Sequence, residues 1–307
     1  MLEYLLELVL DGLNRTGRME SAPRLSIITP VFNGEGFIGG CIESVAAQNC
    51  AGVEHIVVDG GSTDGTVEIL REKAHTHSHL RWISEPDRGQ SDAMNKGIAM
   101  ARAEYIGVLN ADDFYEPGAL SRIVDTISNL PEPRFIVGVC NVLTVGDELL
   151  YVNRPTVPKF ENIVVDEQVW PCPVNPAAYF YPKTIHNVVG LYNVDEHQGM
   201  DFEFILAAVQ AIEPLYIDVV LGNWRHIPGT KTFDSHSDSS IWALKRKIRR
   251  AAWKRASLKT KLRTILLLSR HRPYYRLRLA YWDFYNRRAA RRRNMGLPAN
   301  PGSAGSA

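Results

Sequence analysis

Residues 25–127 repeat one pattern four times, in which a short apolar segment precedes a segment with helical spacing of its apolar residues. The apolar segments read "LSIITPVF", "EHIVVDG", "LRWISEP" and "YIGVLNA". Parallel strands need a crossover, usually a helix, to bring the chain back to the same edge of the sheet. The alternation therefore predicts an α/β fold of Rossmann-like type with a largely parallel central sheet.

Polar residues follow each of the four predicted strands. The segments concerned are "PVFNGE", "DGGSTDG", "EPDRGQSD" and "NADD". In open α/β sheets, ligands bind in the crevice beyond the carboxyl ends of the strands. We therefore expect one binding site built from these four loops.

Two neighbouring acids, Asp112 and Asp113, end the last of these loops. Like charges this close repel each other unless a cation binds them or one of them keeps its proton. Their position predicts a function for the pair. There is no G-x-G-x-x-G after the first strand and no Walker lysine motif, which argues against dinucleotide-binding and P-loop enzymes.

The later chain predicts further elements and the limits of the domains. "FIVGVCNVL" and "AAYFYP" read as strands, "GMDFEFILAAVQAI" reads as an amphipathic helix, and "PLYIDVVLGNWRHIPGTKT" reads as a strand that leads into a loop. We expect an N-terminal amphipathic helix over 1–22, a main domain over 23–235 with halves at 23–130 and 131–235, a basic helical region over 236–294, and a disordered tail over 295–307. The cysteines, which show no C-x-x-C spacing, indicate a reduced, cytoplasmic setting; they are Cys41, Cys50, Cys140 and Cys172.

Charge is distributed very unevenly along the chain. Residues 241–293 hold 19 Lys and Arg against one acid, Asp283, so this segment carries +18 and the remainder −17. Basic residues mixed with Trp, Tyr and Leu are typical of a helix that lies on an anionic membrane surface. The alternative is a helical appendage packed on the main domain. We expect no nucleic-acid partner, because no known nucleic-acid-binding module accompanies the charge.

Four motifs in order, "IITPVFNGEGFIGGCIESVAAQ", "VVDGGSTDGT", "DRGQSDAMNKG" and "LNADD", resemble the signature of family 2 glycosyltransferases with the GT-A fold, among them bacterial polysaccharide-building enzymes. The resemblance covers roughly residues 25–232. It implies that "NADD" is the family's DxD-type motif, with Asp113 as the direct ligand of Mg²⁺ or Mn²⁺ and Asp112 facing the sugar or ribose. Asn110 stands where the family has its first acid, so Asp112 stays an alternative metal ligand.

The resemblance also implies a nucleotide-sugar donor, with a UDP-sugar favoured. Asp59 would hydrogen bond the base, and Pro30, Phe32 and Glu35 would flank it. Arg88 and Lys96 would contact phosphate or sugar. The complete expected donor site is Pro30, Phe32, Glu35, Asp59, Gly61, Asp87, Arg88, Asp92, Asn95, Lys96 and Asp112.

Transfer to a hydroxyl acceptor also requires a general base. By resemblance the base is Asp201 in "HQGMDFEFIL", with Glu203 as runner-up. The alternative is that Asp201 only favours the start of a helix, since an acid there interacts well with the helix dipole. His226 is a further candidate for the metal or the diphosphate, and Lys231 is a weaker one.

Together these features predict an inverting, metal-dependent glycosyltransferase. Its acceptor would be a lipid-linked or growing glycan of the cell envelope or of an exopolysaccharide, at the inner face of the cytoplasmic membrane. One alternative is a catalytically silent scaffold that binds nucleotide sugars at the membrane. Another, a nucleotidyltransferase, is disfavoured because "TPVFNGEGF" lacks the Arg and Lys which that class places after its first strand.

Overall fold

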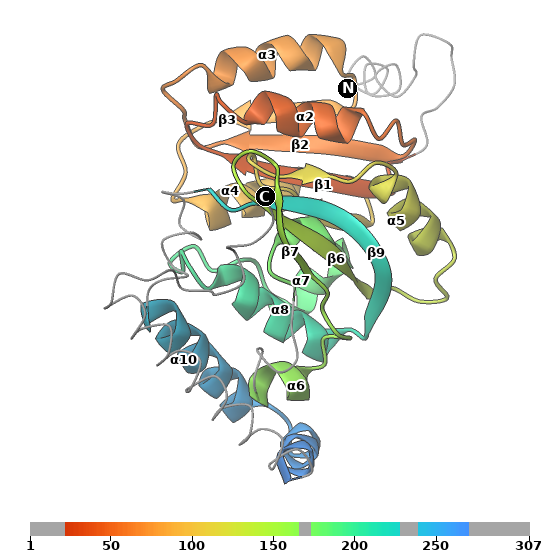
Figure 1. Cartoon of the computed structure of the whole chain (residues 1–307), viewed down its shortest axis with the longest axis vertical. Coiled ribbons are helices and arrows are strands. Elements are labelled where there is room, and N and C mark those ends of the chain that lie inside the picture. The colour runs from red at the N-terminus through yellow and green to blue at the C-terminus, as the bar shows by residue number, and fades with distance from the viewer. Residues whose placement is uncertain (1–21, 166–172, 228–238, 270–307) are drawn as a thin grey trace, which may run out of the picture.

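The computed structural model describes residues 22–165, 173–227 and 239–269. Within them, nine strands form one sheet in the order β3-β2-β1-β4-β8-β6-β9-β5, and β7 pairs with β6 (Figure 1). The strands are β1 (Leu25–Val31), β2 (Val53–Asp59), β3 (Leu80–Ser84), β4 (Tyr105–Val108), β5 (Phe114–Tyr115), β6 (Phe135–Leu143), β7 (Leu149–Asn153), β8 (Tyr179–Pro182) and β9 (Pro214–Arg225).

The first half of the sheet is parallel, as predicted. β1 pairs with β2 and β4, and β2 pairs with β3, all in parallel. The register sets Val31 beside Asp59 and Asp59 beside Ser84. The polar loops after these strands therefore meet at one edge of the sheet.

The second half is mixed. β8 runs antiparallel to both β4 and β6, whereas β6 and β9 are parallel. Two strands were not predicted. β5 is only two residues long and pairs with β9, and β7 is a short edge strand, LLYVN, whose first three residues are exposed.

Helices cover both faces of the sheet (Figure 1). One face packs against α2 (Ile38–Ala46), α3 (Thr66–Thr76) and α5 (Ala119–Ser128) through a buried cluster that includes Ile27 and Val57. The other face packs against α4 (Gln90–Met100), α6 (Phe160–Val165) and α8 (Met200–Ala211) through a cluster that includes Ile28 and Ile56. Short helical turns precede and follow β8: η1 (Pro176–Ala178), η2 (Lys183–Ile185) and α7 (His186–Val189).

The first helix of the basic region packs on the main domain. α10 (Ser239–Arg255) lies beside α8 in Figure 1, and Ile248 and Ala252 pack against the same cluster as α8. A Cβ at Gly199 would lie 2.6 Å from Ile248, so the start of α8 and α10 approach closely. The packed-appendage alternative thus describes α10, and a further helical segment follows over 258–269.

Several predictions fall on other parts of the chain. Residues 1–21, the tail over 295–307, Cys172 and Lys231 lie outside the described residues. Cys41, Cys50 and Cys140 are free thiols. In the three described ranges, no helix has the length and apolar character needed to cross a bilayer.

Candidate active site

A cavity of about 760 Å³ lies beyond the carboxyl ends of β1 and β4. Its volume is within the range typical of small-molecule sites. Its wall is built by the loop after β1, the start of α4, the loop after β4, residues 173–179, the start of α8, the end of β9, and α10. Of the residues predicted from sequence, those that line it are Pro30, Phe32, Asp87, Asp112 and Asp201.

The two neighbouring acids have different surroundings. Asp112 lines the cavity together with Asn110 and Ala111. Asp113 is completely buried behind them and does not line it. Of the two predicted metal ligands, Asp112 is therefore the one at the cavity wall, whereas the carboxylate of Asp113 is buried in the protein interior.

Asp113 accepts hydrogen bonds from three residues that surround the cavity wall. Its Oδ2 accepts hydrogen bonds from the side-chain amides of Asn110 at 2.9 Å and Asn175 at 2.7 Å, and its Oδ1 accepts from the backbone N–H of Arg225 at 3.1 Å. Burial, and then the charge of Asp112, raise the pKa of Asp113 well above that of an ordinary aspartate. The raised pKa favours the protonated form of Asp113, which relieves the repulsion within the acid pair.

Arg225 is a functional residue that the sequence analysis missed. Its guanidinium donates to Asp147 Oδ1 at 2.6 Å and Oδ2 at 3.1 Å, and to the backbone carbonyl of Asp112 at 3.0 Å. It also lies 4.5 Å from the centre of the Phe114 ring. The hydrogen bonds to Asp147 raise the pKa of Arg225, which stays a fixed cation beside the acid pair.

Asp201 is the second residue of α8 and faces the cavity from the opposite half of the chain. Its Oδ1 accepts a hydrogen bond from the Tyr179 hydroxyl at 3.2 Å. Burial raises the pKa of Asp201 to about 6, while the hydrogen bond from Tyr179 acts in the opposite direction. A carboxylate that titrates near neutral pH is suited to general-base catalysis. Glu203 does not line the cavity.

Asp59 and Glu35 hold loops rather than the cavity surface. Asp59 is fully buried, and its Oδ2 accepts from the backbone N–H groups of Gly61 at 3.1 Å and Ser62 at 3.0 Å and from the Ser84 hydroxyl at 2.6 Å. Glu35 accepts from the backbone N–H of Gly65 at 2.7 Å. Both stay outside the cavity wall because their carboxylates are engaged within the loops.

Asp87 lines the cavity beside Gly60, whose lack of a side chain leaves room for the Asp87 carboxylate. A Cβ at Gly60 would lie 2.6 Å from Asp87 Oδ2. Asp87 is also fixed by its own turn, since its Oδ1 accepts from the backbone N–H of Gly89 at 2.7 Å. Gly61, the predicted neighbour of Gly60, has φ +85° and does not line the cavity.

The predicted polar face of α4 has other partners. Asn95 exchanges two 2.9 Å hydrogen bonds with the backbone of Tyr192. Lys96 forms an ion pair with Glu85 at 2.9 Å and lies 3.8 Å from Asp92. Arg88 is exposed on the turn before α4. None of the four residues expected to contact the donor from this turn and helix lines the cavity; these are Arg88, Asp92, Asn95 and Lys96. In the structure the loop at Tyr192 engages Asn95, and the strand-end acid Glu85 engages Lys96.

His226 follows β9 but does not line the cavity. Its backbone N–H donates to the carbonyl of Leu143 at 2.9 Å, and its ring meets that of Trp224 edge-on. Trp224 lines the cavity instead. Over the described part of the chain, no three His, Cys, Asp or Glu side chains are grouped so that they could hold a metal by themselves.

The side chains available as metal ligands at the cavity suit a hard divalent cation that the protein alone holds weakly. Mg²⁺ and similar ions commonly take one or two protein carboxylates and complete their shell with substrate phosphate oxygens and water. Asp112 offers one such carboxylate at the cavity wall. The residues present are therefore compatible with a divalent ion that binds together with a phosphate-bearing ligand.

Other wall residues carried no motif in the sequence. The wall includes His197 and Gln198 before α8, and Ile241 and Lys245 of α10. Lys245 Nζ also lies 5.2 Å from the centre of the Phe202 ring. The only sequence signal for α10 was its basic charge, which suggested a membrane and not a cavity wall.

Comparison with known proteins bears on the activity. The family model for glycosyl transferase family 2 matches residues 26–178. The chain is 35% identical over 205 residues to an uncharacterized glycosyltransferase of Mycobacterium tuberculosis, which covers 66% of this chain and 75% of that protein. It is 29% identical over 214 residues to a PGL/p-HBAD biosynthesis glycosyltransferase of Mycobacterium bovis, covering 68% and 79% of the two chains.

A solved structure shows the same fold. The fragment 1–349 of TarS from S. aureus, in complex with UDP-GlcNAc, superposes with a TM-score of 0.62. The match covers 81% of this chain and 72% of that one at 16% sequence identity. At this identity the likeness concerns the fold, which is the mixed α/β arrangement of GT-A glycosyltransferases.

Proposed function

Because this chain belongs to glycosyl transferase family 2, we propose that it transfers a sugar from a nucleoside-diphosphate sugar to a hydroxyl acceptor with inversion at the anomeric carbon. The observation that carries this proposal is that Asp112 and Asp201, from the two halves of the chain, face one cavity. Asp112 is suited to the diphosphate end of a donor, and Asp201 is suited to an acceptor hydroxyl.

The chemistry follows from a single base. Asp201 takes the proton of the acceptor hydroxyl while the acceptor oxygen bonds to the anomeric carbon and the bond from that carbon to the diphosphate oxygen breaks. Attack from the face opposite the leaving group inverts the anomeric configuration. The raised pKa of Asp201, about 6, lets its carboxylate be ionised at neutral pH and still basic enough to accept the proton.

Asp112 is the residue that would hold a divalent cation, Mg²⁺ or Mn²⁺. Such an ion would neutralise the charge that develops on the diphosphate leaving group. Arg225 and Asp113 position the backbone and the flank of Asp112, so that its carboxylate need not be reoriented when the donor binds.

For the donor we propose a UDP-sugar, and for the acceptor a lipid-linked or growing glycan. The donor choice is supported by the TarS fragment, which shares the fold and was solved with UDP-GlcNAc. The acceptor class is supported by the relative in PGL/p-HBAD biosynthesis and by a 36% identity over 107 residues to chondroitin synthase of Escherichia coli. We place the enzyme at the inner face of the cytoplasmic membrane, which suits the basic C-terminal region.

A donor screen tests the proposal. The full chain would be mixed with UDP-, GDP- and dTDP-sugars in Mg²⁺, Mn²⁺ or EDTA, and both thermal shift and nucleotide release would be recorded. We expect a metal-dependent response to one nucleotide class, absent in Asp112→Asn. Donor binding with no transfer to any glycan or lipid-linked acceptor would instead favour the silent scaffold, and no binding would overturn both.

A further inference from the structure

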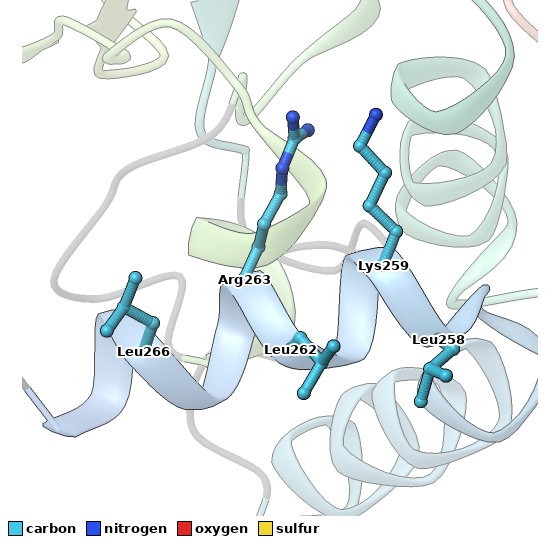
Figure 2. Close-up of a pocket in the computed structure, with 5 residues that line it drawn as sticks. All are labelled: Leu258, Lys259, Leu262, Arg263 and Leu266. Atoms are coloured by element: carbon cyan, nitrogen blue, oxygen red, sulfur yellow. The ribbon is translucent and has the colours of Figure 1, made fainter.

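The helical segment 258–269 presents a row of large apolar side chains to solvent. Leu258, Leu262, Ile265 and Leu266, the leucine band, are 73%, 58%, 54% and 69% exposed. Figure 2 shows Leu258, Leu262 and Leu266 along one side of the helix, with Lys259 and Arg263 projecting from another. Four such residues in a row on one short helix form a contiguous patch, whereas single exposed leucines are common.

The exposed leucine band and the buried side of this helix lie on opposite sides of it. At 100° per residue, the leucine band spans about 100° of the helix circumference. Thr264, on the far side, is buried and Leu267 on the same side is half-buried, so the helix packs on the protein through that side and leaves the leucine band outside. This arrangement is the reverse of an ordinary surface helix, whose apolar stripe faces the core.

Cations flank the leucine band on both sides. Lys261 lies on one edge, and Lys259 and Arg263 lie on the other. The Arg263 guanidinium is 3.8 Å from the carboxylate of Glu161, and the Lys261 ammonium donates to the carbonyl of Lys254. An apolar band with basic residues on both edges is the pattern of a helix that lies in the plane of a membrane interface.

We propose that the leucine band docks on the surface of an anionic lipid bilayer. A bilayer offers both things the surface requires, an apolar layer for the leucines and anionic headgroups for the flanking cations. The charge distribution favours the same orientation, because residues 241–293 carry 19 basic residues and one acid while the remainder is acidic and would be repelled. The inference deepens the proposed location and does not depend on the transfer reaction.

Docking at this surface bears on the active site through α10. The leucine band follows α10 directly, and α10 contributes Ile241 and Lys245 to the cavity wall. The same helix packs closely against Gly199, two residues before Asp201. Only residues 256–257 separate the helix that carries the leucine band from α10, which contacts the Asp201 side of the cavity, and this proximity suits an acceptor carried on a lipid.

Vesicle sedimentation of the full chain tests the proposal. The variant Leu258→Ser/Leu262→Ser/Leu266→Ser would be compared with wild type and with a matched control, Val145→Ser/Leu149→Ser/Leu150→Ser, whose side chains are also 50–59% exposed but lie on or beside β7. Vesicles would contain phosphatidylcholine alone or with phosphatidylglycerol. We expect wild type and control to bind the anionic vesicles, and the band variant to bind them at least roughly tenfold more weakly.

A charge variant and a folding readout complete the test. Lys259→Glu/Arg263→Glu is expected to weaken binding to anionic vesicles and to remove its salt dependence in part. The melting temperature of every variant, measured without ligand, separates lost docking from lost folding and is independent of the vesicle result and of nucleotide binding. Equal vesicle binding by the band variant and wild type would overturn the proposal, as would a wild-type dimer that the band substitutions convert to a monomer while vesicle binding stays unchanged.

Discussion

The guanidinium of Arg225 donates to the backbone carbonyl of Asp112 at 3.0 Å, across 113 positions of the sequence. The backbone N–H of Arg225 donates to the side chain of Asp113, so one residue of β9 holds both acids. The far side of the guanidinium is fixed by two hydrogen bonds that it donates to Asp147 in the loop between β6 and β7. The geometry of the acid loop is therefore set by the second half of the chain.

Replacing Arg225 by Lys tests this relationship. A lysine keeps the charge but has no planar fork with which to bind Asp147 twice and Asp112 at the same time. We expect kcat/KM for transfer to fall about tenfold, equivalent to ~1.4 kcal/mol, with folding retained. The matched control is Arg154→Lys, whose exposed ion pair with Asp218 lies on the surface and whose loss should leave the rate unchanged. Equal rates for the Arg225→Lys variant and wild type would contradict the positioning role.

The two acids should respond differently to the same substitution. Asp112→Asn leaves the core intact but removes the carboxylate of the cavity wall, so we expect unchanged thermal stability and loss of the metal-dependent response to the donor. Asp113→Asn keeps a single acceptor oxygen, so its amide N–H₂ faces either the backbone N–H of Arg225 or the side-chain amides of Asn110 and Asn175. An unsatisfied buried polar group costs about 1–3 kcal/mol, so the melting temperature should fall by several degrees.

Thermal melts of both variants with and without Mg²⁺ and UDP measure the two effects. Because Asp112 lines the cavity and Asp113 is buried, we expect Asp112→Asn to lose the metal response without a change in melting temperature, and Asp113→Asn to lower the melting temperature. If Asp113→Asn melted like wild type and lost the metal response while Asp112→Asn kept it, the assignment would be reversed.

Much of the fold could be predicted because it rests on short-range patterns. The four parallel strands and their helices have apolar periodicity of their own, and the polar loops lie at strand ends for a topological reason that any such sheet shares. Asp201 could be placed because its position at the start of an amphipathic helix is visible in the sequence.

The roles of individual side chains depended on long-range contacts and could not be predicted in this way. Lys96 lies on the face of α4 that was expected to reach the donor site, but it forms an ion pair with Glu85, which follows β3. Asp113 and Asp112 are indistinguishable in the sequence, and only the packing of Asn175 and Arg225 separates them. Arg225 itself carries no motif, because its partners are 78 and 113 residues away.

Gly60 should be required for its small size. A methyl group there would approach Asp87 Oδ2 to 2.6 Å and push this carboxylate from its place on the cavity wall. We expect Gly60→Ala to raise the KM for the donor several-fold with little change in fold. Gly40→Ala on α2 is the control, because a Cβ at that position meets no atom within 4 Å. Initial rates at varied donor concentration measure the effect, and an unchanged KM for Gly60→Ala would count against a donor contact by Asp87.

Asp201→Asn should abolish transfer without preventing donor binding. General-base catalysis contributes roughly 10²- to 10⁴-fold, so the rate should fall within that range while the affinity for UDP stays as in wild type. Glu203→Gln, two residues along the same helix and off the cavity wall, should transfer at nearly the wild-type rate. A larger loss in Glu203→Gln than in Asp201→Asn would transfer the role of base to Glu203.

The pH dependence of transfer should report the ionisation of Asp201. Burial raises the pKa of Asp201 to about 6, and only the ionised carboxylate accepts a proton, so kcat/KM should rise with pH through about 6 and level off above it. The Tyr179 hydroxyl donates to this carboxylate and favours its charged form. Tyr179→Phe removes that hydrogen bond, which raises the pKa of Asp201 further and moves the rising limb to higher pH. Profiles of both proteins, measured with saturating donor, check the sign of the shift. A shift to lower pH, or none, would mean that the titrating group is not Asp201.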